Sequence, residues 1–396
     1  MTDSRQDIKV YPMLLRAIRL LSFVLVMALA ASCTLPRRPA QPPPPSAPLV
    51  PVAWSQVEGW LEDDLAQVPE AFEKSCIALG RRPQWQQVCS EAANLEGSSE
   101  TAVRSFFEEH FTPYQLRQPD NDPVGMVTGY YVPDLWGSRQ PSEDYPYPLY
   151  RRPDDLLVID LSSAYPELGK YRLRGRLEGQ RVLPYYDREA IDGHRQPLAG
   201  NELLWIDDPV ELFFLHIQGS GRILFEDGSR VMVNYAGQNG HPYRSISKWL
   251  IEQGIMTRDE MSMQNIRAWA RDNPSQVGDL LNTNPSYVFF RESSGDADGS
   301  PPGALGVPLT PGRSVAVDRR YTPLGAPVFL ATTWPNTDRP LYRLMMAQDT
   351  GGAIKGPVRA DFFWGMGNDA GMEAGRMKQP LKMWVLLPVE KPEEGD

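Results

Sequence analysis

The chain has 396 residues, of which 41% are hydrophobic and 23% charged, as in ordinary globular proteins. Its formal net charge of −10, without a basic stripe along the sequence, excludes an electrostatic attraction to DNA or RNA, so no nucleic-acid partner is expected. The 38 prolines and 32 glycines indicate many turns and therefore short strands.

The N-terminus is typical of an export signal. Basic side chains precede the apolar run from Leu20 to Ala31, which is too short to span a bilayer comfortably as a helix. Small residues then lead to Cys33 in "ALAASC", which resembles the lipobox of bacterial lipoproteins. We therefore predict a signal peptide over residues 1–32 and lipidation of Cys33. The alternative is an ordinary cleaved signal with an incidental cysteine.

A Pro-rich segment follows this cysteine. Residues 33–52, which include "PRRPAQPPPPSAP", cannot pack a core and suit a stiff, extended tether. Thr34 rather than an aspartate follows the cysteine, and by the usual sorting rule this implies the outer membrane. We expect a lipid-anchored protein on the periplasmic face of a Gram-negative outer membrane.

The rest of the chain is predicted to be mainly β with flanking helices. Residues 54–112 show apolar side chains at helical spacing, and Ser99 or Thr101 can cap the last of these helices. Residues 123–239 are predicted to form short strands, including the apolar stretch "VELFFLHIQ" and a hairpin with its turn at "FEDGSR". Two short helices follow, the second capped by Ser262, before a β-rich tail.

The cysteine count favours one disulfide. If Cys33 carries lipid, Cys76 and Cys89 remain, and two cysteines in an exported protein are more often bonded than free. The four histidines are scattered singly, and neither remaining cysteine has a histidine nearby. We therefore expect no metal site.

Three aspartates near the C-terminus, Asp318, Asp349 and Asp361, are the candidate catalytic groups. Asp349 begins "DTG", the tripeptide of aspartic proteases, but those enzymes need two such loops and this chain has one. A homodimer could supply the second loop, so a protease remains an alternative. A turn shaped by glycines, in which aspartates are common, is the other simple explanation.

Glycoside cleavage explains Asp361 better. In peptidoglycan the C6 hydroxyl of muramic acid can attack C1 of the same ring, so one carboxyl can protonate the leaving oxygen and then accept the hydroxyl proton. That carboxyl must start protonated, which requires an apolar setting that raises its pKa. Asp361 is followed by the aromatic run "FFW", which offers such a setting. The glycines beside Asp349 favour a role in shaping a loop or accepting hydrogen bonds.

Motifs in both halves of the chain resemble known sequences. "VDRRYTPLGAPVFL", "AQDTGGAIKGPVRADFFWGMGNDAG" and "MWVLLP" resemble the three-aspartate (3D) domain, whose namesake residues match Asp318, Asp349 and Asp361. Upstream, "GYYVPDLWGSR", "FFLHIQGSGRI", "YAGQNGHPYRSI", "MSMQNIRAW" and "NPSYVFFRE" resemble the membrane-bound lytic murein transglycosylase A family. The motifs follow the family's order from about residue 100 to 388.

The resemblance implies a double-psi β-barrel that is discontinuous in sequence. Residues 53–122 and 243–390 would form the barrel domain with its helices, and the 3D domain would lie at about 305–388. Residues 123–242 would form an inserted β-rich, barrel-like domain that binds glycan. The family's glycan groove lies between these two domains.

The resemblance also implies a lytic transglycosylase, a carbon–oxygen lyase acting on peptidoglycan. It would cut the β-1,4 bond between N-acetylmuramic acid and N-acetylglucosamine without water, leaving 1,6-anhydromuramic acid ends. Asp361 matches the family's catalytic acid, with Asp349 and Asp318 in support. No metal or organic cofactor is implied. Glycan strands would be the partners, with wall-synthesis enzymes as further candidates, and an inactive peptidoglycan-binding module remains an alternative.

Several other residues are candidates for substrate binding. Tyr130 and Tyr131 could stack on sugar rings, or could alternate in and out of a strand. Four polar residues of Gly-rich loops could contact N-acetyl or peptide groups: Gln218, Ser220, Asn239 and His241. A structural role is the alternative for the histidine, which precedes a proline. Lys355, between two of the aspartates, could balance charge near the site.

Overall fold

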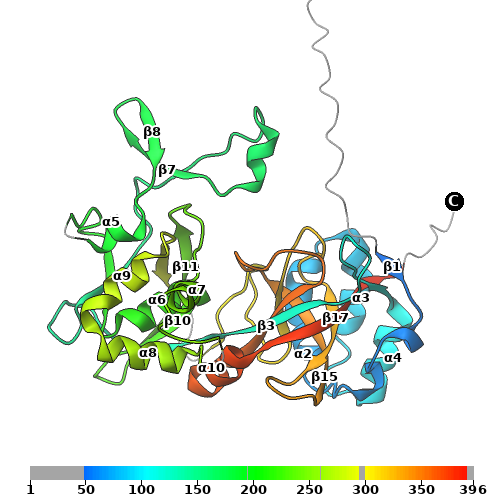
Figure 1. Ribbon diagram of the computed structural model, residues 1–396. Helices are drawn as coiled ribbons and strands as arrows, with labels where there is room; N and C mark the ends of the chain where they lie inside the picture. The colour runs from blue at the N-terminus through cyan, green and yellow to red at the C-terminus, as the bar shows by residue number, and fades with distance from the viewer. Residues whose placement is uncertain (1–48, 194, 259, 294–298, 390–396) are drawn as a thin grey trace, which may run out of the picture. The chain divides into compact units, whose positions relative to one another are not determined.

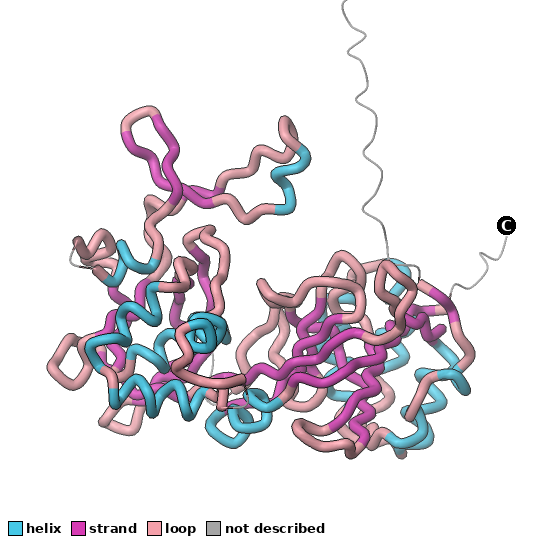
Figure 2. The backbone as a smooth tube through the Cα atoms, in the orientation of Figure 1, coloured by secondary structure: helices cyan, strands magenta, loops and turns pink. Residues whose placement is uncertain are grey.

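The structure is a computed structural model that describes residues 49–193, 195–258, 260–293 and 299–389 (Figure 1). Strands predominate and helices flank them, which confirms the predicted mainly β fold (Figure 2). The predicted signal peptide, the lipidation site at Cys33 and nearly all of the tether lie outside the described residues. Within the described part, no helix is both long and apolar enough to cross a membrane.

The largest sheet has eight strands and closes on itself. Its strands, in spatial order, are β1 (Val50–Pro51), β2 (Phe111–Gln115), β17 (Lys378–Pro388), β14 (Pro327–Thr333), β15 (Pro340–Asp349), β13 (Ser314–Val317), β16 (Arg359–Met366) and β3 (Gly125–Val132). Because β17 also pairs with β3, the run from β17 to β3 forms a closed ring of strands. Closure removes exposed edges, as in a barrel. The double-psi connectivity stays a prediction.

Helices close one side of this ring and supply part of its core. The turns η1 (Trp54–Gln56) and η2 (Trp60–Glu62) precede α2 (Val68–Leu79), α3 (Pro83–Ala92) and α4 (Glu100–His110). Ser99 caps α4 by accepting a hydrogen bond from the Ala102 N–H, as its sequence position predicts. The structure joins Cys76 of α2 to Cys89 of α3. The disulfide thus ties two helices that lie far from the three aspartates in sequence.

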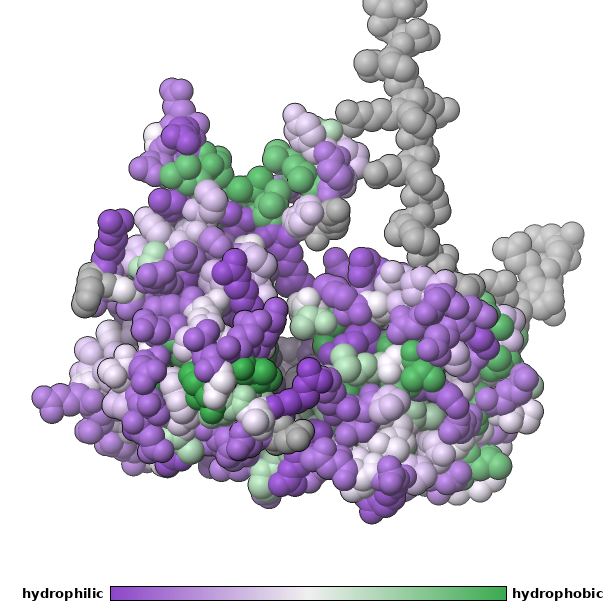
Figure 3. Space-filling model, viewed as in Figure 1, coloured by the Kyte–Doolittle hydropathy of each residue, from purple (hydrophilic) through white to green (hydrophobic). Residues whose placement is uncertain are grey.

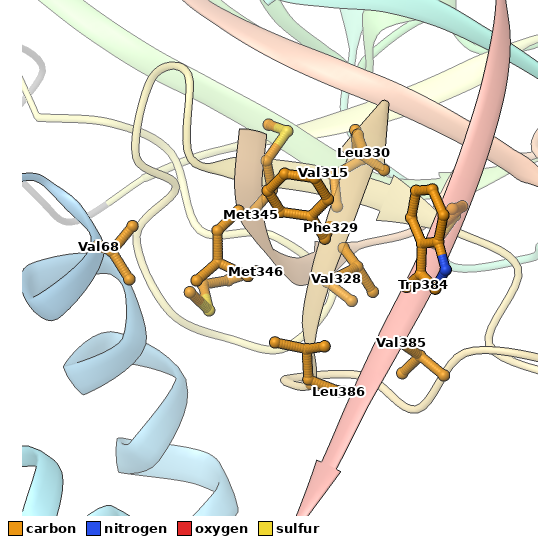
Figure 4. Close-up of a cluster of buried hydrophobic side chains, with 14 of the residues drawn as sticks. Val68, Val315, Val328, Phe329, Leu330, Met345, Met346, Trp384, Val385 and Leu386 are labelled. Carbon is orange, nitrogen blue, oxygen red and sulfur yellow. The ribbon is translucent and has the colours of Figure 1, made fainter. Parts of the chain in front are cut away.

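The core of the ring is a single apolar cluster shared by strands and helices (Figure 4). Val315, Phe329 and Trp384, from three different strands of the ring, are each at most 1% exposed. Val68 of α2 belongs to the same cluster. Burial of about 25 cal/mol per Å² of such apolar surface is the main force that holds the ring closed.

The second sheet has six strands. Their spatial order is β12 (Val288–Glu292), β11 (Arg230–Gln238), β10 (Ser220–Leu224), β4 (Asp134–Ser138), β9 (Glu202–Ile206) and β5 (Tyr147–Tyr150). β10 and β11 form the predicted hairpin, and Gly228 in its Asp-Gly turn adopts a φ of +82° that favours glycine. This sheet has its own apolar cluster, which includes Leu135 and Phe290.

Residues 209–218 are helical, so the expectation of strands in "VELFFLHIQ" is wrong. They form α6 (Pro209–Gln218). The Asp208 carboxylate accepts hydrogen bonds from the N–H groups of the helix start, Pro209 occupies the first turn, and Gly219 ends the helix with a φ of +79°. These start and stop signals are present in the sequence, but the apolar run between them suits a buried strand equally well.

Three more helices pack against α6 rather than against the ring. They are α7 (Ile246–Glu252), α8 (Met263–Asp272) and α9 (Val277–Asn282), and the turn η4 (Pro274–Gln276) precedes α9. Ser262 caps α8, as predicted. Since β3 belongs to the first sheet and β12 to the second, the sheets divide the chain near residues 133 and 292, not at the predicted 123 and 242. The apolar faces of these helices bury Val210 and Phe213 of α6, so the helices belong with the second sheet's part of the chain and its C-terminal bound lies beyond residue 242.

A small three-stranded sheet projects from the second sheet's part of the chain. It consists of β6 (Leu157–Val158), β7 (Arg174–Glu178) and β8 (Arg181–Pro184), with the turn η3 (Pro166–Lys170) before β7 and the short helix α5 (Arg188–Asp192) after β8. Exposed aliphatic side chains gather here, visible as green at the top of Figure 3. Leu177 and Val182 are among them.

One further helix, α10 (Gly367–Arg376), follows β16 directly and lies against β3 (Figure 1). This helix lies within the tail that the sequence predicts to be β-rich. A Cβ on Gly371 would lie 2.7 Å from the Tyr131 ring, and one on Gly129 would lie 2.8 Å from Ala374 Cα. Glycine at these two positions therefore allows the helix and the strand to approach closely.

Candidate active site

A row of paired residues crosses four adjacent strands of the ring. Thr128 of β3 pairs with Asp361 of β16, which pairs in turn with Ala316 of β13. Ala316 also pairs with Asp349 of β15. Paired residues of neighbouring strands point to the same face, so Thr128, Asp361 and Ala316 share one face. A register shift lies at the Ala316–Asp349 pair, but Tyr130, two residues after Thr128 on β3, bonds to Asp349, so Asp349 faces the same way. Two strand spacings put their backbones about 10 Å apart.

Asp361 is desolvated but keeps one carboxylate oxygen unbonded. Its Oδ1 accepts a hydrogen bond of 2.5 Å from the Thr128 hydroxyl, and Arg359 Nη2 donates to the same hydroxyl at 2.9 Å. Among the described residues, none forms a hydrogen bond with Oδ2. Burial raises the pKa of Asp361 to about 6, while the Thr128 hydrogen bond and the Arg359 charge act in the opposite direction.

Asp349 is held by three donors. The Tyr130 hydroxyl donates to Oδ2 at 3.1 Å, and the N–H groups of Ala304 and Thr350 donate to Oδ1 at 2.9 and 2.8 Å. Burial raises the pKa of Asp349, and these hydrogen bonds lower it in part. Burial and the two carboxylates raise the pKa of Tyr130 well above its usual value, so its hydroxyl remains a neutral donor.

Tyr130 therefore joins the site through its hydroxyl. Its ring packs on Phe363 with centroids 5.1 Å apart. Tyr131, the next residue, lies on the other face of β3 and is only 6% exposed. Its N–H donates to Gln218 Oε1 at 3.2 Å, which ties α6 to the end of β3. Stacking on sugars stays a prediction for both tyrosines, and in this structure the geometry favours a packing role for Tyr131.

Asp318 lies apart from this row, directly after β13. Burial acts to raise its pKa, but hydrogen bonds from Arg320 and from the Gly356 N–H at 2.9 Å prevail, and the pKa is lowered. Asp318 is thus an ionised anchor that fastens the loop 350–356 to the end of β13. The same loop begins directly after Asp349, so the two aspartates hold its two ends.

The polar candidates of the second sheet's part are engaged in internal hydrogen bonds. Ser220 Oγ donates to Asn234 Oδ1 at 3.0 Å. Asn239 is 1% exposed, donates to two backbone carbonyls and accepts from two N–H groups. His241 Nε2 lies 2.7 Å from the Tyr185 carbonyl. These bonds hold neighbouring loops together, and contact of the three residues with substrate stays a prediction.

Lys355 lies in the loop that follows Asp349 and is exposed. Partial burial and the charges of neighbouring arginines lower its pKa, while Asp318 acts to raise it. Lys355 therefore lies within a group of positive charges rather than between two bare carboxylates.

Sequence reasoning missed Thr128 and Arg359. Thr128 is 233 residues from Asp361 along the chain, and no local pattern relates them. Arg359 is two residues before Asp361 on the same strand, so the strand period places both on one face. This spacing of two residues is the sequence signal that could have identified Arg359. Within the described ranges, no cluster of three or more His, Cys, Asp or Glu side chains could hold a metal ion.

Two segments of the chain match described protein families. Residues 126–291 match the MltA specific insert domain, and residues 313–387 match the 3D domain. The chain therefore belongs to the class of proteins that combine a 3D domain with an MltA-type insert. The chain is 34% identical to membrane-bound lytic murein transglycosylase A of Escherichia coli K12 over 280 residues, 69% of this chain and 68% of that protein. The Vibrio cholerae protein of the same name is 33% identical over 281 residues, with the same shares covered. The chain belongs to the membrane-bound lytic murein transglycosylase A family.

Solved structures agree with this assignment. MltA from Neisseria gonorrhoeae is 37% identical, with a TM-score of 0.74 over 92% of this chain and 98% of that one. The lytic transglycosylase LtgG of Burkholderia pseudomallei is 47% identical, with a TM-score of 0.61 over 86% and 96%. E. coli MltA with bound chitohexaose is 29% identical, with a TM-score of 0.62 over 81% and 89%.

Proposed function

We propose that the chain is a peptidoglycan lytic transglycosylase that cleaves the β-1,4 bond between N-acetylmuramic acid and N-acetylglucosamine without hydrolysis. The named activity of the relatives and the chitohexaose bound to one of them support a glycan substrate. The single observation that carries the mechanism is Asp361, a half-buried carboxyl with a pKa of about 6 and one unbonded oxygen.

The reaction uses Asp361 twice. Its protonated carboxyl donates the proton to the glycosidic oxygen as the C1–O4 bond breaks, which frees the 4-hydroxyl of N-acetylglucosamine. The resulting carboxylate accepts the proton of the muramic acid C6 hydroxyl as O6 bonds to C1. The products are a free 4-hydroxyl and a 1,6-anhydromuramic acid end, and Asp361 is protonated again. A pKa near 6 suits both steps, because the acid and base forms interconvert near neutral pH.

The neighbours of Asp361 serve this cycle. Thr128 and Arg359 stabilise the carboxylate and so prevent its pKa from rising further. Tyr130 keeps the second carboxylate, Asp349, fixed by a hydrogen bond. Asp349 and Asp318 support the site through loop shape and electrostatics. The barrel would comprise the strands of the closed ring, and residues from about 133 to 292 would form the glycan-binding insert.

Digestion of purified sacculi tests this function. The wild-type protein should release muropeptides with anhydro ends, identified by mass, and labelled water should not enter the new C1 position. Asp361→Asn should keep the fold and glycan binding but lose turnover by several orders of magnitude, because acid and base contributions of about 100- to 10,000-fold each are lost together. Asp318→Asn and Asp349→Asn should cost less, or should unfold the protein.

The outcomes separate the alternatives. Binding of sacculi without cleavage would indicate an inactive binding module, and cleavage of protein substrates would indicate a protease. Oxygen-18 at C1, or wild-type turnover in Asp361→Asn, would overturn the mechanism.

We also propose an outer-membrane lipoprotein, anchored through Cys33 on the periplasmic face. The basic start, the short apolar run and the small residues before Cys33 support this location. Cells that express the protein should incorporate labelled palmitate into it. Cys33→Ser should abolish the label, and a variant that still carried it would rule out this anchor.

A further inference from the structure

We propose that Arg172, Arg319 and Lys355 form a surface that binds the carboxylates of the peptide attached to muramic acid. The inference rests on the proposed function, because it concerns a second part of the same substrate. It adds a preference for peptide-bearing, negatively charged glycan strands to the cleavage of the glycosidic bond.

Three segments far apart in sequence supply these residues. Lys355 lies in the loop 350–356, which starts directly after Asp349. Arg319 follows Asp318, the residue that fastens the other end of the same loop. Arg172 comes from the segment before β7, and its Nη1 lies 4.0 Å from the position that a Cβ would take on Gly352. The absence of a side chain on Gly352 leaves the space beside this guanidinium open.

The local charge is strongly positive in an acidic protein. Three guanidinium groups, those of Arg172, Arg319 and Arg320, act on the Lys355 ammonium, and Asp318 is the one carboxylate that acts on it. These four cations and one anion carry an excess of three positive charges. Asp318 is already engaged by Arg320 and the loop backbone. Among the described residues, no carboxylate lies within ion-pair distance of Arg172, Arg319 or Lys355.

The positive surface continues beyond the loop. Burial raises the pKa of Tyr235 in β11, while the charges of Arg172, Arg174 and Arg152 act to lower it, which shows that these three guanidinium groups lie near one ring. A Cβ on Gly240 would lie 2.7 Å from Arg174 Cβ. The basic groups therefore form a band rather than one isolated contact. The formal charge of the whole chain is −10, so this band is not the consequence of a generally basic surface.

The chemistry of the substrate identifies the anion. The sugar rings of peptidoglycan are uncharged, because the lactyl carboxyl of muramic acid is joined to the peptide as an amide. The negative charge of an intact strand therefore resides on the carboxylates of the peptide. The loop 350–356 spans at most about 25 Å and begins at Asp349 in the active-site row. A peptide on a muramic acid held at that row comes within reach of the basic band. Guanidinium and ammonium groups bind carboxylates through charge-assisted hydrogen bonds.

The test compares two forms of one substrate. Soluble glycan strands with intact peptides are assayed beside the same strands after their carboxylates have been coupled to methylamine, which removes the charge but keeps the peptide. For the wild type, kcat/KM should be higher on the charged strands at about 0.01 M salt, and the difference should shrink near 0.5 M. In the double variant Arg172→Gln/Arg319→Gln, kcat/KM on charged strands should fall about 2- to 30-fold, while the value for methylamidated strands should not change.

The matched control removes the same charge elsewhere. Arg181 and Lys248 are exposed, and Arg181→Gln/Lys248→Gln should leave both kcat/KM values unchanged. Equal cleavage of both substrates by the wild type, or equal losses on both in the Arg172/Arg319 variant, would refute the peptide surface while leaving the proposed function intact. Failure of the wild type to cleave either substrate would refute the proposed function itself. Salt-sensitive binding to phosphatidylglycerol vesicles through these arginines, without a peptide effect, would assign the surface to lipid and overturn the inference.

Discussion

Replacing Thr128 with valine should move the pH dependence of the enzyme. The Thr128 hydroxyl donates to Asp361 Oδ1 at 2.5 Å, and this bond favours the charged carboxylate. A hydrogen bond to a charged group contributes about 1.5–3 kcal/mol, and one pH unit in pKa corresponds to about 1.36 kcal/mol. The isosteric Thr128→Val change removes the donor and leaves the burial in place. The pKa of Asp361 should therefore rise by about 1–2 pH units above its present value near 6.

The measurement is kcat/KM for anhydro-muropeptide release between pH 4 and 9. Because the first step needs protonated Asp361, kcat/KM should fall as pH rises through its pKa, and in Thr128→Val this descending limb should lie at higher pH. Thr128→Ser keeps the hydroxyl that accepts from Arg359 and donates to Asp361, so its profile should match the wild type. A descending limb that stays in place or moves to lower pH in Thr128→Val would refute the assignment of the acid.

Three further outcomes concern stability. Because burial raises the pKa of Asp361 to about 6, the folded state binds this proton more tightly than the unfolded state does. The free energy of unfolding should therefore fall as pH rises from about 4 to 6. Asp361→Asn should therefore raise Tm at pH 8 but not at pH 4, and equal changes at both would contradict the burial argument. Reduction of the Cys76–Cys89 bond, which closes a loop of about fourteen residues, should cost on the order of 3 kcal/mol and lower Tm more than room-temperature activity. An unchanged Tm would speak against this. Asp63 is fully buried and forms ion pairs with two arginines, so Asp63→Ala should lower the free energy of unfolding in urea by about 3–5 kcal/mol. Asp64 is exposed, and Asp64→Ala should lower it by less than about 1 kcal/mol.

Local sequence signals predict much of the secondary structure correctly. The serines at positions 99 and 262 cap helices, and the Asp-Gly turn before β11 closes a hairpin, because each depends only on nearby residues. The helix α6 was missed because ten mainly apolar residues fit a buried strand as well as a buried helix. The bounds of the two sheets differ from those of the predicted domains for a related reason: the sheet that β3 or β12 joins depends on pairing across the fold, which no local pattern reveals.

In the candidate site, too, local sequence predicts some features, whereas others depend on pairing between distant strands. The aromatic run after Asp361 predicted a raised pKa, and burial does raise it. Thr128 and Ala316, which flank Asp361 in the sheet, could not be found, because their pairing depends on strand register. Asn239 and His241 looked like ligand groups because they are polar residues in a Gly-rich loop. In the structure these side chains form hydrogen bonds with backbone groups of neighbouring loops, a role that depends on the fold, and their contact with substrate stays a prediction.

The three aspartates are chemically identical, and their surroundings separate their roles. Asp318 accepts from a guanidinium and a backbone N–H that lower its pKa, so it stays ionised and cannot act as an acid near neutral pH. Asp349 is half-buried and burial raises its pKa, but both of its oxygens accept hydrogen bonds, which favour the carboxylate and lower the pKa in part. Asp361 combines a raised pKa with an oxygen that no described residue occupies. This combination, a pKa of about 6 and an oxygen free to present the proton to a glycosidic oxygen, is the reason why we propose Asp361 for both the acid and the base role.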